Sequence, residues 1–396
     1  MLKWERRMAD FLMSHLLIVA VVFATIASIY ARYRFFPYMS SDMTDFLIKW
    51  FDQIKAAGGV KALRTPVGDY GIQYQTVIAL LTYIPVDSTV QFKLLSCAFD
   101  YLLAWGLSRL IYELSGKRLL QAMTYIAAIA MPTVMLNSAA WGQCDSIYSF
   151  FCVLTLLMLA REKYIACFLA YGMAFSFKLQ AIFLLPMLLF MWIYRRRYSI
   201  LHFLLVPATY FLTCLPAIIA GRPVCTIFDA YLVQVGEYPR IAMNYPSLWL
   251  LMQDNRRRAY YGTSHMMAIV FTVIVLLCIM VLLLRLCSRL DTKDFPGLAF
   301  IFAYTCVIFL PSMHERYGYL YVVLCIAVIA LERRMWPAFL AIMMIDMHIY
   351  GKFLFRIKET NWQLLAFLNF CCYAYCVWVI VAPLLARRIP SAENNA

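Results

Sequence analysis

Charged residues are scarce in this sequence of 396 residues: Asp, Glu, Lys and Arg make up 14% of it, whereas 64% is hydrophobic. A soluble domain usually carries about 25% charged residues and fewer than half apolar ones. A chain this poor in charge lacks the polar surface that a water-soluble fold requires, so lipid must surround it. The composition therefore excludes an ordinary soluble protein and predicts an integral membrane protein.

Other signals are also missing. The sequence has no Cys/His spacing typical of structural zinc, and most of its 13 cysteines lie inside apolar runs, where they act as small hydrophobes. We see no internal repeat and no low-complexity tract. The net charge of +14 comes from short basic clusters between apolar runs, which anchor loops at a lipid surface and do not indicate nucleic-acid binding.

Apolar runs near the length that a bilayer requires, roughly 20 residues, recur along the whole chain. The first has no small-residue cleavage site after it, so we interpret it as a retained span rather than a signal peptide. The region 164–194 is the weakest part of this assignment because Lys178 interrupts it. The predicted twelve spans lie near 12–33, 89–112, 119–137, 144–160, 164–177, 179–194, 200–220, 264–286, 295–312, 317–332, 335–350 and 363–386.

The basic loops give the predicted orientation. With twelve spans, most short basic loops fall on one side, which by the positive-inside rule is cytoplasmic together with both termini. Arg256, Arg257 and Arg258 fall outside, as do the basic residues between 49 and 64. We therefore predict an all-α polytopic bundle in one domain, 1–388, followed by a flexible cytoplasmic tail, 389–396.

Two long loops, about 34–88 and 221–263, lie on the predicted outer side. The first contains the apolar segment Thr76–Ile84, closed by Pro85. This segment is too short to span a bilayer, so we predict a short interfacial helix.

Polar side chains gather at the outer ends of the predicted spans, whereas the inner loops hold little besides Lys and Arg. Carboxylates, cations and a histidine on one face predict a site that opens outward at the bilayer boundary. The set comprises Asp42, Asp45, Asp69, Trp141, Gln143, Asp145, Lys178, Gln180, Arg240, Asn244, His314, Glu315, Arg316, Lys352 and Arg356.

The acids of this set allow two interpretations. Asp42 and Asp45 are three residues apart, so on a helix they share a face, and such a carboxylate suits general-base chemistry. Ser41 or Asp42 equally suits a helix N-cap. Asp145 opens a predicted span directly, where an acid is favoured by the helix dipole.

The cationic residues of this set also allow two interpretations. Lys178 at a membrane edge either extends its amine to the headgroups or binds a lipid phosphate. His314, Glu315 and Arg316 follow Pro311 at the end of a span, and they form either a structural ion pair or part of a site.

Two acids lie deeper in the predicted spans, where ionisable groups are costly. For Asp100, which neighbours Tyr101 and Arg109, we predict a buried ion pair or hydrogen bond. Asp346 and His348 are two residues apart, so we expect them on different faces of their helix.

Taken together, several segments resemble the GT-C superfamily of membrane glycosyltransferases, which use lipid-phosphate sugars. The likeness covers most of the chain and is greatest to bacterial relatives of the second mannosyltransferase of GPI-anchor assembly. It rests on SDMTDFLIKWFDQIKAAGG (41–59) with GDYGIQY (68–74), WGQCDSIY (141–148), FKLQAIFLLP (177–186) and PSMHERYGYL (311–320), and MNYPSLW (243–249) is also similar.

The resemblance implies transfer of a mannose- or glucose-type hexose from a polyprenyl-phosphate-sugar donor to a glycan or lipid-linked acceptor, with inversion. It implies Asp42 as catalytic base and Lys178, His314 and Arg316 near the donor phosphate. The implied sugar and acceptor pocket comprises Asp45, Asp69, Trp141, Gln143, Asp145, Gln180, Asn244 and Glu315. No cofactor is required, although the Asp42/Asp45 pair is compatible with a weakly bound divalent cation.

The sequence departs from the family pattern at Lys49, where many relatives have a proline, and at Gln73-Tyr74, where several have Pro-Tyr. Both departures fall at the acceptor end. The likeness favours a bacterial plasma membrane with the site facing outward. The competing interpretations are a transporter or flippase of lipid-linked glycans or small solutes, and a polysaccharide ligase or polymerase with a lipid-diphosphate donor.

Overall fold

The computed structural model describes residues 2–236, 240–252, 261–357 and 360–387. Every regular element in these ranges is a helix, which confirms the predicted all-α class. The predicted tail 389–396 and the basic cluster Arg256–Arg258 lie outside the described residues.

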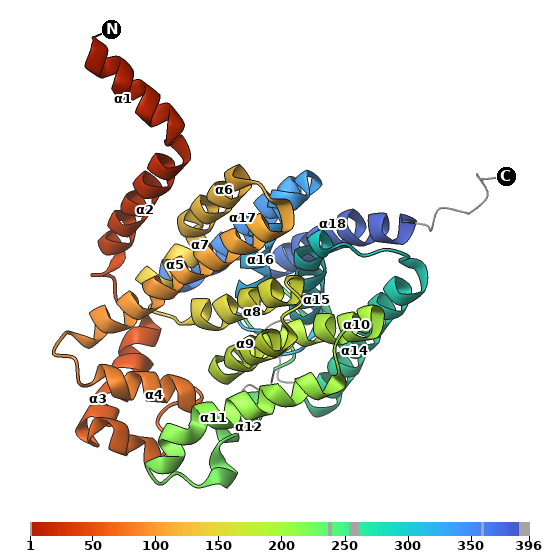
Figure 1. Ribbon diagram of the computed structural model, residues 1–396. Helices are drawn as coiled ribbons and strands as arrows, with labels where there is room; N and C mark the ends of the chain where they lie inside the picture. The colour runs from red at the N-terminus through yellow and green to blue at the C-terminus, as the bar shows by residue number, and fades with distance from the viewer. Residues whose placement is uncertain (1, 237–239, 253–260, 358–359, 388–396) are drawn as a thin grey trace.

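The first half of the chain forms a bundle with a small helical unit inserted near its start (Figure 1). Its elements are α1 (Lys3–Ser14), α2 (Leu16–Phe35), the π-helical turn η1 (Met43–Leu47), α3 (Ile48–Ala56), the 3-10 turn η2 (Gly59–Arg64), α4 (Ile72–Leu81), α5 (Ser88–Ser115), α6 (Arg118–Ala130), α7 (Pro132–Met135), the π-helical turn η3 (Leu136–Ala140), α8 (Asp145–Ala160) and α9 (Tyr164–Phe177).

The second half continues the bundle. Its elements are the 3-10 turn η4 (Leu179–Leu184), α10 (Leu185–Arg195), η5 (Ile200–Leu204), α11 (Leu205–Ile219), η6 (Val224–Thr226), α12 (Asp229–Gly236), α13 (Trp249–Met252), α14 (Tyr261–Leu286), η7 (Thr292–Asp294), α15 (Phe295–Phe309), α16 (Tyr319–Leu331), η8 (Arg333–Met335), α17 (Trp336–Leu354) and α18 (Trp362–Ala386).

The helices make this a multi-pass membrane protein. In the described residues 7 helices are long and apolar enough to cross a membrane, or up to 8 if the bent pair at Met131 is one span. The predicted count of twelve is therefore not confirmed. Each predicted run does coincide with apolar helix, but α8, α9 and α16 have only 16, 14 and 13 residues.

α8, α9 and α16 are short for the same reason. α8 begins at Asp145, α9 ends immediately before Lys178, and α16 begins shortly after Arg316. Each helix thus stops where the chain places polar side chains inside the bundle. Surrounding protein covers these ends, whereas α2 is only 11% and α14 only 22% buried in their most apolar windows. Shortened helices are tolerated in a membrane where neighbouring protein satisfies their ends.

A bend interrupts the predicted run 119–137. α6 ends at Ala130 and α7 begins with Pro132, and the two segments meet at an angle of 49°. Proline suits the first turn of a helix because its missing N–H has no partner there, but it cannot continue a preceding helix. The chain then passes through η3 into the loop before α8.

The predicted short helix at 76–84 is present as α4, which begins and ends earlier than predicted, at Ile72 and Leu81. η1 and α3 form one continuous helical stretch before it. Met43, Leu47, Phe51 and Ile54, at most 4% exposed, are spaced three or four apart and pack against α4 and α11 in a satellite core. α3 and α4 therefore lie with α11 and α12 at one end of the molecule (Figure 1).

Candidate functional site

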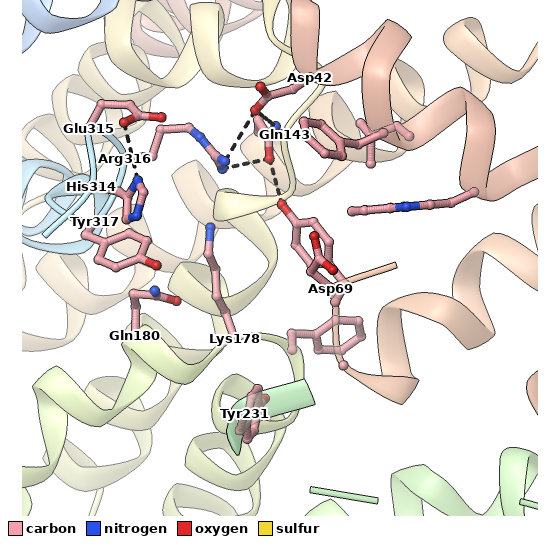
Figure 2. A pocket seen from close by; sticks show the side chains of 16 residues that line it. Asp42, Asp69, Gln143, Lys178, Gln180, Tyr231, His314, Glu315, Arg316 and Tyr317 are labelled. Atoms are coloured by element: carbon pink, nitrogen blue, oxygen red, sulfur yellow. Dashed lines mark hydrogen bonds and ion pairs between the residues drawn. The ribbon is translucent and has the colours of Figure 1, made fainter. Parts of the chain in front are cut away.

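One open cavity of about 950 Å³ brings together most of the residues that the sequence predicted for the site. Segments far apart in the chain contribute to it: η1 and α3, the loop before α8, the start of η4 and the loop before α16. Figure 2 shows Lys178 between Asp69 on one side and His314 and Glu315 on the other. The predicted residues that line it are Asp42, Asp69, Gln143, Lys178, Gln180, His314, Glu315 and Arg316.

Ser40, rather than Ser41 or Asp42, caps the helical stretch. The Ser40 hydroxyl accepts a hydrogen bond from the Met43 amide at 3.2 Å and donates one to the Trp141 carbonyl at 2.9 Å. Asp42 makes no side-chain cap bond. The N-cap interpretation of Asp42 is therefore wrong, and its carboxylate is used elsewhere.

One carboxylate oxygen of Asp42 is held by three donors. Oδ2 accepts from Trp141 Nε1 at 3.0 Å, from Gln143 Nε2 at 2.7 Å and from Arg316 Nη2 at 3.4 Å. Among the described residues, Oδ1 has no hydrogen-bond partner. The side chain is 26% exposed and lines the cavity. The carboxylate is thus fixed in orientation while one oxygen stays available to a ligand.

Gln143 is oriented so that it must donate to Asp42. Its Oε1 accepts from Tyr70 Oη and from Arg316 Nη1, both at 2.7 Å, which leaves the amide nitrogen for Asp42. Burial, above all, raises the pKa of Tyr70 well above its ordinary value, so the phenol keeps its proton and donates. The sequence did not single out Tyr70, although this residue lies within the GDYGIQY segment.

The backbone around Trp141 explains how these donors reach Asp42. η3 closes with a bond from the Trp141 amide to the Leu136 carbonyl, at 2.8 Å, and π-helical turns of this kind recur at functional sites. Gly142 follows with a φ of +76°, a conformation that side chains rarely adopt. A Cβ at Gly142 would also collide with the Met43 side chain.

Asp145 lies behind the cavity wall and holds both cations. It is fully buried, and it forms ion pairs with Lys178 Nζ and with Arg316 Nη1, the latter at 3.3 Å. Asn137 Nδ2 donates to it at 2.8 Å. Lys178 is only 11% exposed and points into the protein, so it does not extend to the headgroups. Asp145 positions the cations and does not itself line the cavity.

The predicted pair in the loop before α16 is both structural and part of the site. His314 Nδ1 lies 3.6 Å from Glu315 Oε2, which also accepts from Asn244 Nδ2 at 3.5 Å. Burial opposes ionisation of Glu315, but the His314 hydrogen bond and the Arg316 charge outweigh it and lower the Glu315 pKa. Burial likewise opposes the Arg316 charge, yet the surrounding acids and Tyr70 raise its pKa well above the ordinary value.

Not every predicted residue reaches the cavity. Asp45 is exposed, and it accepts only from Thr44 Oγ1 at 3.5 Å, so the expectation that it shares a face with Asp42 is wrong. In η1 the hydrogen bonds run from i to i+5, so residues four apart align instead of residues three apart. Asp45 therefore does not line the cavity together with Asp42. The described ranges hold no cluster of three or more His, Cys, Asp or Glu able to hold a metal ion.

Other predicted residues lie behind the cavity wall or away from it. Trp141 donates a hydrogen bond to Asp42, and Asn244 donates one to Glu315, without lining the cavity themselves. Arg240, Lys352 and Arg356 do not line the cavity. The cavity also has an aromatic lining that the pattern of polar residues did not predict. It consists of Phe46, Trp50, Tyr70, Phe177, Tyr231 and Tyr317.

The two deep acids behave as predicted. Arg32 donates to Asp100 Oδ2 through Nε at 3.1 Å and Nη2 at 3.0 Å, so the buried ion pair is confirmed, with a partner from α2 rather than Arg109. Asp346 accepts from Thr133, whereas His348 contacts Thr360 Oγ1 at 3.1 Å, as expected for different helix faces.

The Asp100 ion pair also supports the site. Asp100 accepts from Ser146 Oγ at 2.6 Å and from Ser138 Oγ at 2.5 Å, and these serines lie on either side of the loop 141–145. Lys93, fully buried, donates to the carbonyls of Phe35 and Phe36 at the end of α2. Both interactions hold the chain immediately next to site residues.

A second, mainly apolar groove of about 890 Å³ adjoins the first cavity, and the two share Gln180 and Tyr317. It lies between η4, α14 and the loop before α16, lined among others by Ile182, Phe183 and Ile269. A polar chamber therefore opens beside an apolar surface that lies at membrane helices.

No protein-family model matches the chain, and no curated protein matches its sequence.

Proposed function

We propose that this protein is a membrane glycosyltransferase of the GT-C type, which transfers a hexose from a polyprenyl-phosphate-sugar donor to a glycan or lipid-linked acceptor. The observation that carries the proposal is the Asp42 carboxylate. Three donors hold one of its oxygens, and the Asp42 side chain lines the cavity that contains Lys178 and Arg316. A fixed carboxylate beside fixed cations suits a reaction that needs a base and a stabilised leaving group.

The proposed reaction is a single displacement at the anomeric carbon. An acceptor hydroxyl oxygen bonds to this carbon while Asp42 takes its proton, and the bond from the carbon to the phosphate oxygen breaks. The polyprenyl phosphate leaves with the bonding electron pair. One displacement inverts the anomeric configuration, as in other inverting sugar chemistry.

Lys178 and Arg316 have the proposed task of stabilising the departing phosphate. Asp145 holds both cations before any substrate binds, so little reorganisation is required when negative charge develops. His314, which lines the same cavity, is placed to donate an additional hydrogen bond. These residues need no cofactor for this role.

The apolar groove supports a lipid-linked donor. Because it meets the polar cavity at Gln180 and Tyr317, a donor can keep its hydrocarbon chain among membrane helices while its phosphate and sugar enter the cavity. We further propose twelve spans, cytoplasmic termini and a site facing outward from a bacterial plasma membrane. The helices shortened at the cavity are compatible with this count.

The decisive experiment compares the wild-type chain with Asp42→Asn and Asp45→Asn in lipid nanodiscs. Each is incubated with a panel of radiolabelled polyprenyl-phosphate hexoses and with membrane glycolipid extract, and sugar transfer is measured. We expect Asp42→Asn to lose about 10²–10⁴-fold in rate, the usual effect of removing a general base. Asp45→Asn, a matched substitution outside the cavity, should transfer at the wild-type rate.

Transfer at the wild-type rate by Asp42→Asn would remove this residue from the mechanism. Movement of intact donor across liposome membranes without sugar release would favour a flippase. Activity confined to lipid-diphosphate donors would instead favour a polysaccharide ligase or polymerase.

A further inference from the structure

One wall of the cavity is aromatic, and the reaction proposed above does not use it. Phe46 and Trp50 from the η1–α3 stretch form this wall together with Tyr70. Phe46 is 45% exposed, although it lies on a structured helix rather than in a loose loop. Asp69, next to Tyr70 in sequence, also lines the cavity, across from His314 and Glu315 (Figure 2).

Trp50 is held in one orientation. Its indole ring packs on Gly68, where φ is +70° and where a Cβ would collide with the ring. Tyr70 meets it edge-on, with ring centroids 5.6 Å apart at 71°, and Phe46 lies 5.8 Å away at 50°. These contacts immobilise the ring while it lines the cavity, so it presents a preorganised surface to a ligand.

The aromatic wall is aligned with the proposed base. Asp42, Phe46 and Trp50 follow at intervals of four residues along one continuous helical stretch, and all three line the cavity. An interval of four residues advances a helix by about 6 Å. A ligand lying on Phe46 and Trp50 is therefore directed toward Asp42.

The proposed donor binds on the opposite side of the cavity and does not cover the aromatic wall. The proposed donor occupies the apolar groove, which meets the cavity at Gln180 and Tyr317, and its phosphate contacts Lys178 and Arg316. The aromatic wall comes instead from the inserted unit of η1, α3 and the segment before α4. Asp42 thus lies at the boundary between a cationic side and an aromatic side of one cavity.

We infer that Trp50, Phe46 and Asp69 form the acceptor subsite and that the group bound there is a pyranose ring, which makes the acceptor a carbohydrate. The inference rests on the proposed function. The C–H face of a pyranose packs on the electron-rich face of an aromatic ring. Carboxylate oxygens of Asp69 accept hydrogen bonds from sugar hydroxyls, and the indole N–H of Trp50 is a donor. A glycerol acceptor would offer no such flat apolar face.

The direct test is binding without reaction. Saturation-transfer NMR is recorded with methyl α- and β-hexopyranosides and the full chain in nanodiscs, for the wild type, Trp50→Ala, Phe46→Ala and Trp378→Ala. We expect signal on the pyranose C–H protons of the wild type to fall at least fivefold in Trp50→Ala. Trp378, 63% exposed on α18 and outside the cavity, provides the matched control and should keep the wild-type signal.

Phe46→Ala provides a second test in case Trp50→Ala does not fold. Phe46 is half-exposed, so its truncation creates little empty space in the protein core. The substitution should weaken the signal at least twofold. Wild-type signal in both variants would overturn the subsite, as would an absence of pyranose signal from the wild-type chain.

Kinetics separate this inference from the proposed function. In the transfer assay, Trp50→Ala should raise the KM for acceptor at least ten times more than the KM for donor. Equal changes in both constants, in a chain that still transfers sugar, would reject the acceptor subsite alone. Pyranose binding by a wild-type chain that never consumes a polyprenyl-phosphate hexose would reject the transferase instead.

Discussion

Asp145 shows how a single buried residue organises the cavity. Its two oxygens receive Lys178, Arg316 and Asn137, and it has no exposed surface of its own. A buried carboxylate is tolerated when such partners satisfy it. Lys178 and Arg316 also line the cavity, so their ion pairs with Asp145 fix the positions of both cations there.

Substitution of Lys178 tests whether this cation binds the donor phosphate. We expect Lys178→Ala to raise the KM for the polyprenyl-phosphate sugar about tenfold to hundredfold, because one charged hydrogen bond contributes about 1.5–3 kcal/mol. Steady-state transfer kinetics measure this effect. Lys163→Ala, an exposed lysine before α9, is the matched control and should keep the wild-type KM. An unchanged donor KM in Lys178→Ala would leave Lys178 with only a structural role.

Glu315 makes a prediction about pH. Its pKa lies below the ordinary 4.5 despite burial, because His314 and Arg316 stabilise the carboxylate. Its contribution to stability is thus present above pH 4.5 and is lost as pH falls through the depressed value, since the unfolded chain then binds the proton first. We expect the melting temperature of the wild type to exceed that of Glu315→Gln by a measurable margin at every pH from 8 to 5.

Thermal unfolding followed by intrinsic fluorescence measures this margin in nanodiscs. The margin should shrink progressively below about pH 4.5. A margin that stays constant into stronger acid, or one that vanishes already near pH 6, would contradict the ion pair as its source.

At the scale of elements, irregular turns rather than regular helices position the site. Asp42 directly precedes η1, and η3 leads into Trp141 and Gln143. Both are π-helical, so residues fall on faces that an α-helical spacing does not predict. The error over Asp45 has this origin.

Gly142 is the position where this local geometry can be tested. Gly142→Ala should reduce transfer by more than tenfold, because its Cβ would displace Met43 and move both Trp141 and Gln143 from Asp42. Gly116→Ala is the matched control. Gly116 also has a positive φ, +66°, but a Cβ there meets nothing within 4 Å. We expect it to lose about 1–2 kcal/mol of stability and to keep the wild-type rate.

At the scale of the whole molecule, the proposed orientation is testable with a native cysteine. Among the 13 cysteines, Cys225 is exposed in the loop between α11 and α12, whereas the exposed Cys278 and Cys371 lie on apolar helices that lipid covers. A membrane-impermeant maleimide should therefore label intact cells at Cys225. Cys225→Ser is the control and should abolish labelling.

Labelling that requires permeabilised cells would place this loop, and the cavity beside it, on the cytoplasmic side. The donor would then be needed in the inner leaflet. The chemistry proposed for Asp42 would be unchanged, but the outward-facing site would be wrong.

Much of the fold could be predicted because hydrophobic length is a local property. Helical class, the positions of the apolar runs and the first-loop helix all follow from sequences of about ten to twenty residues. The number of spans could not be decided in this way. α8, α9 and α16 are short because of neighbours that are distant in sequence.

The candidate site likewise has features that are local in the sequence and features that depend on contacts between distant segments. The order of residues identifies which polar side chains stand at the ends of apolar runs, and most of them do meet in one cavity. Helix packing places Asp145 behind that cavity and Asp45 outside it, and it brings Tyr70 to Gln143. Hydrogen bonds and ion pairs depend on distances between side chains, and helix packing sets those distances for residues such as Tyr70 and Gln143 or Asp145 and Arg316, which lie far apart in the sequence.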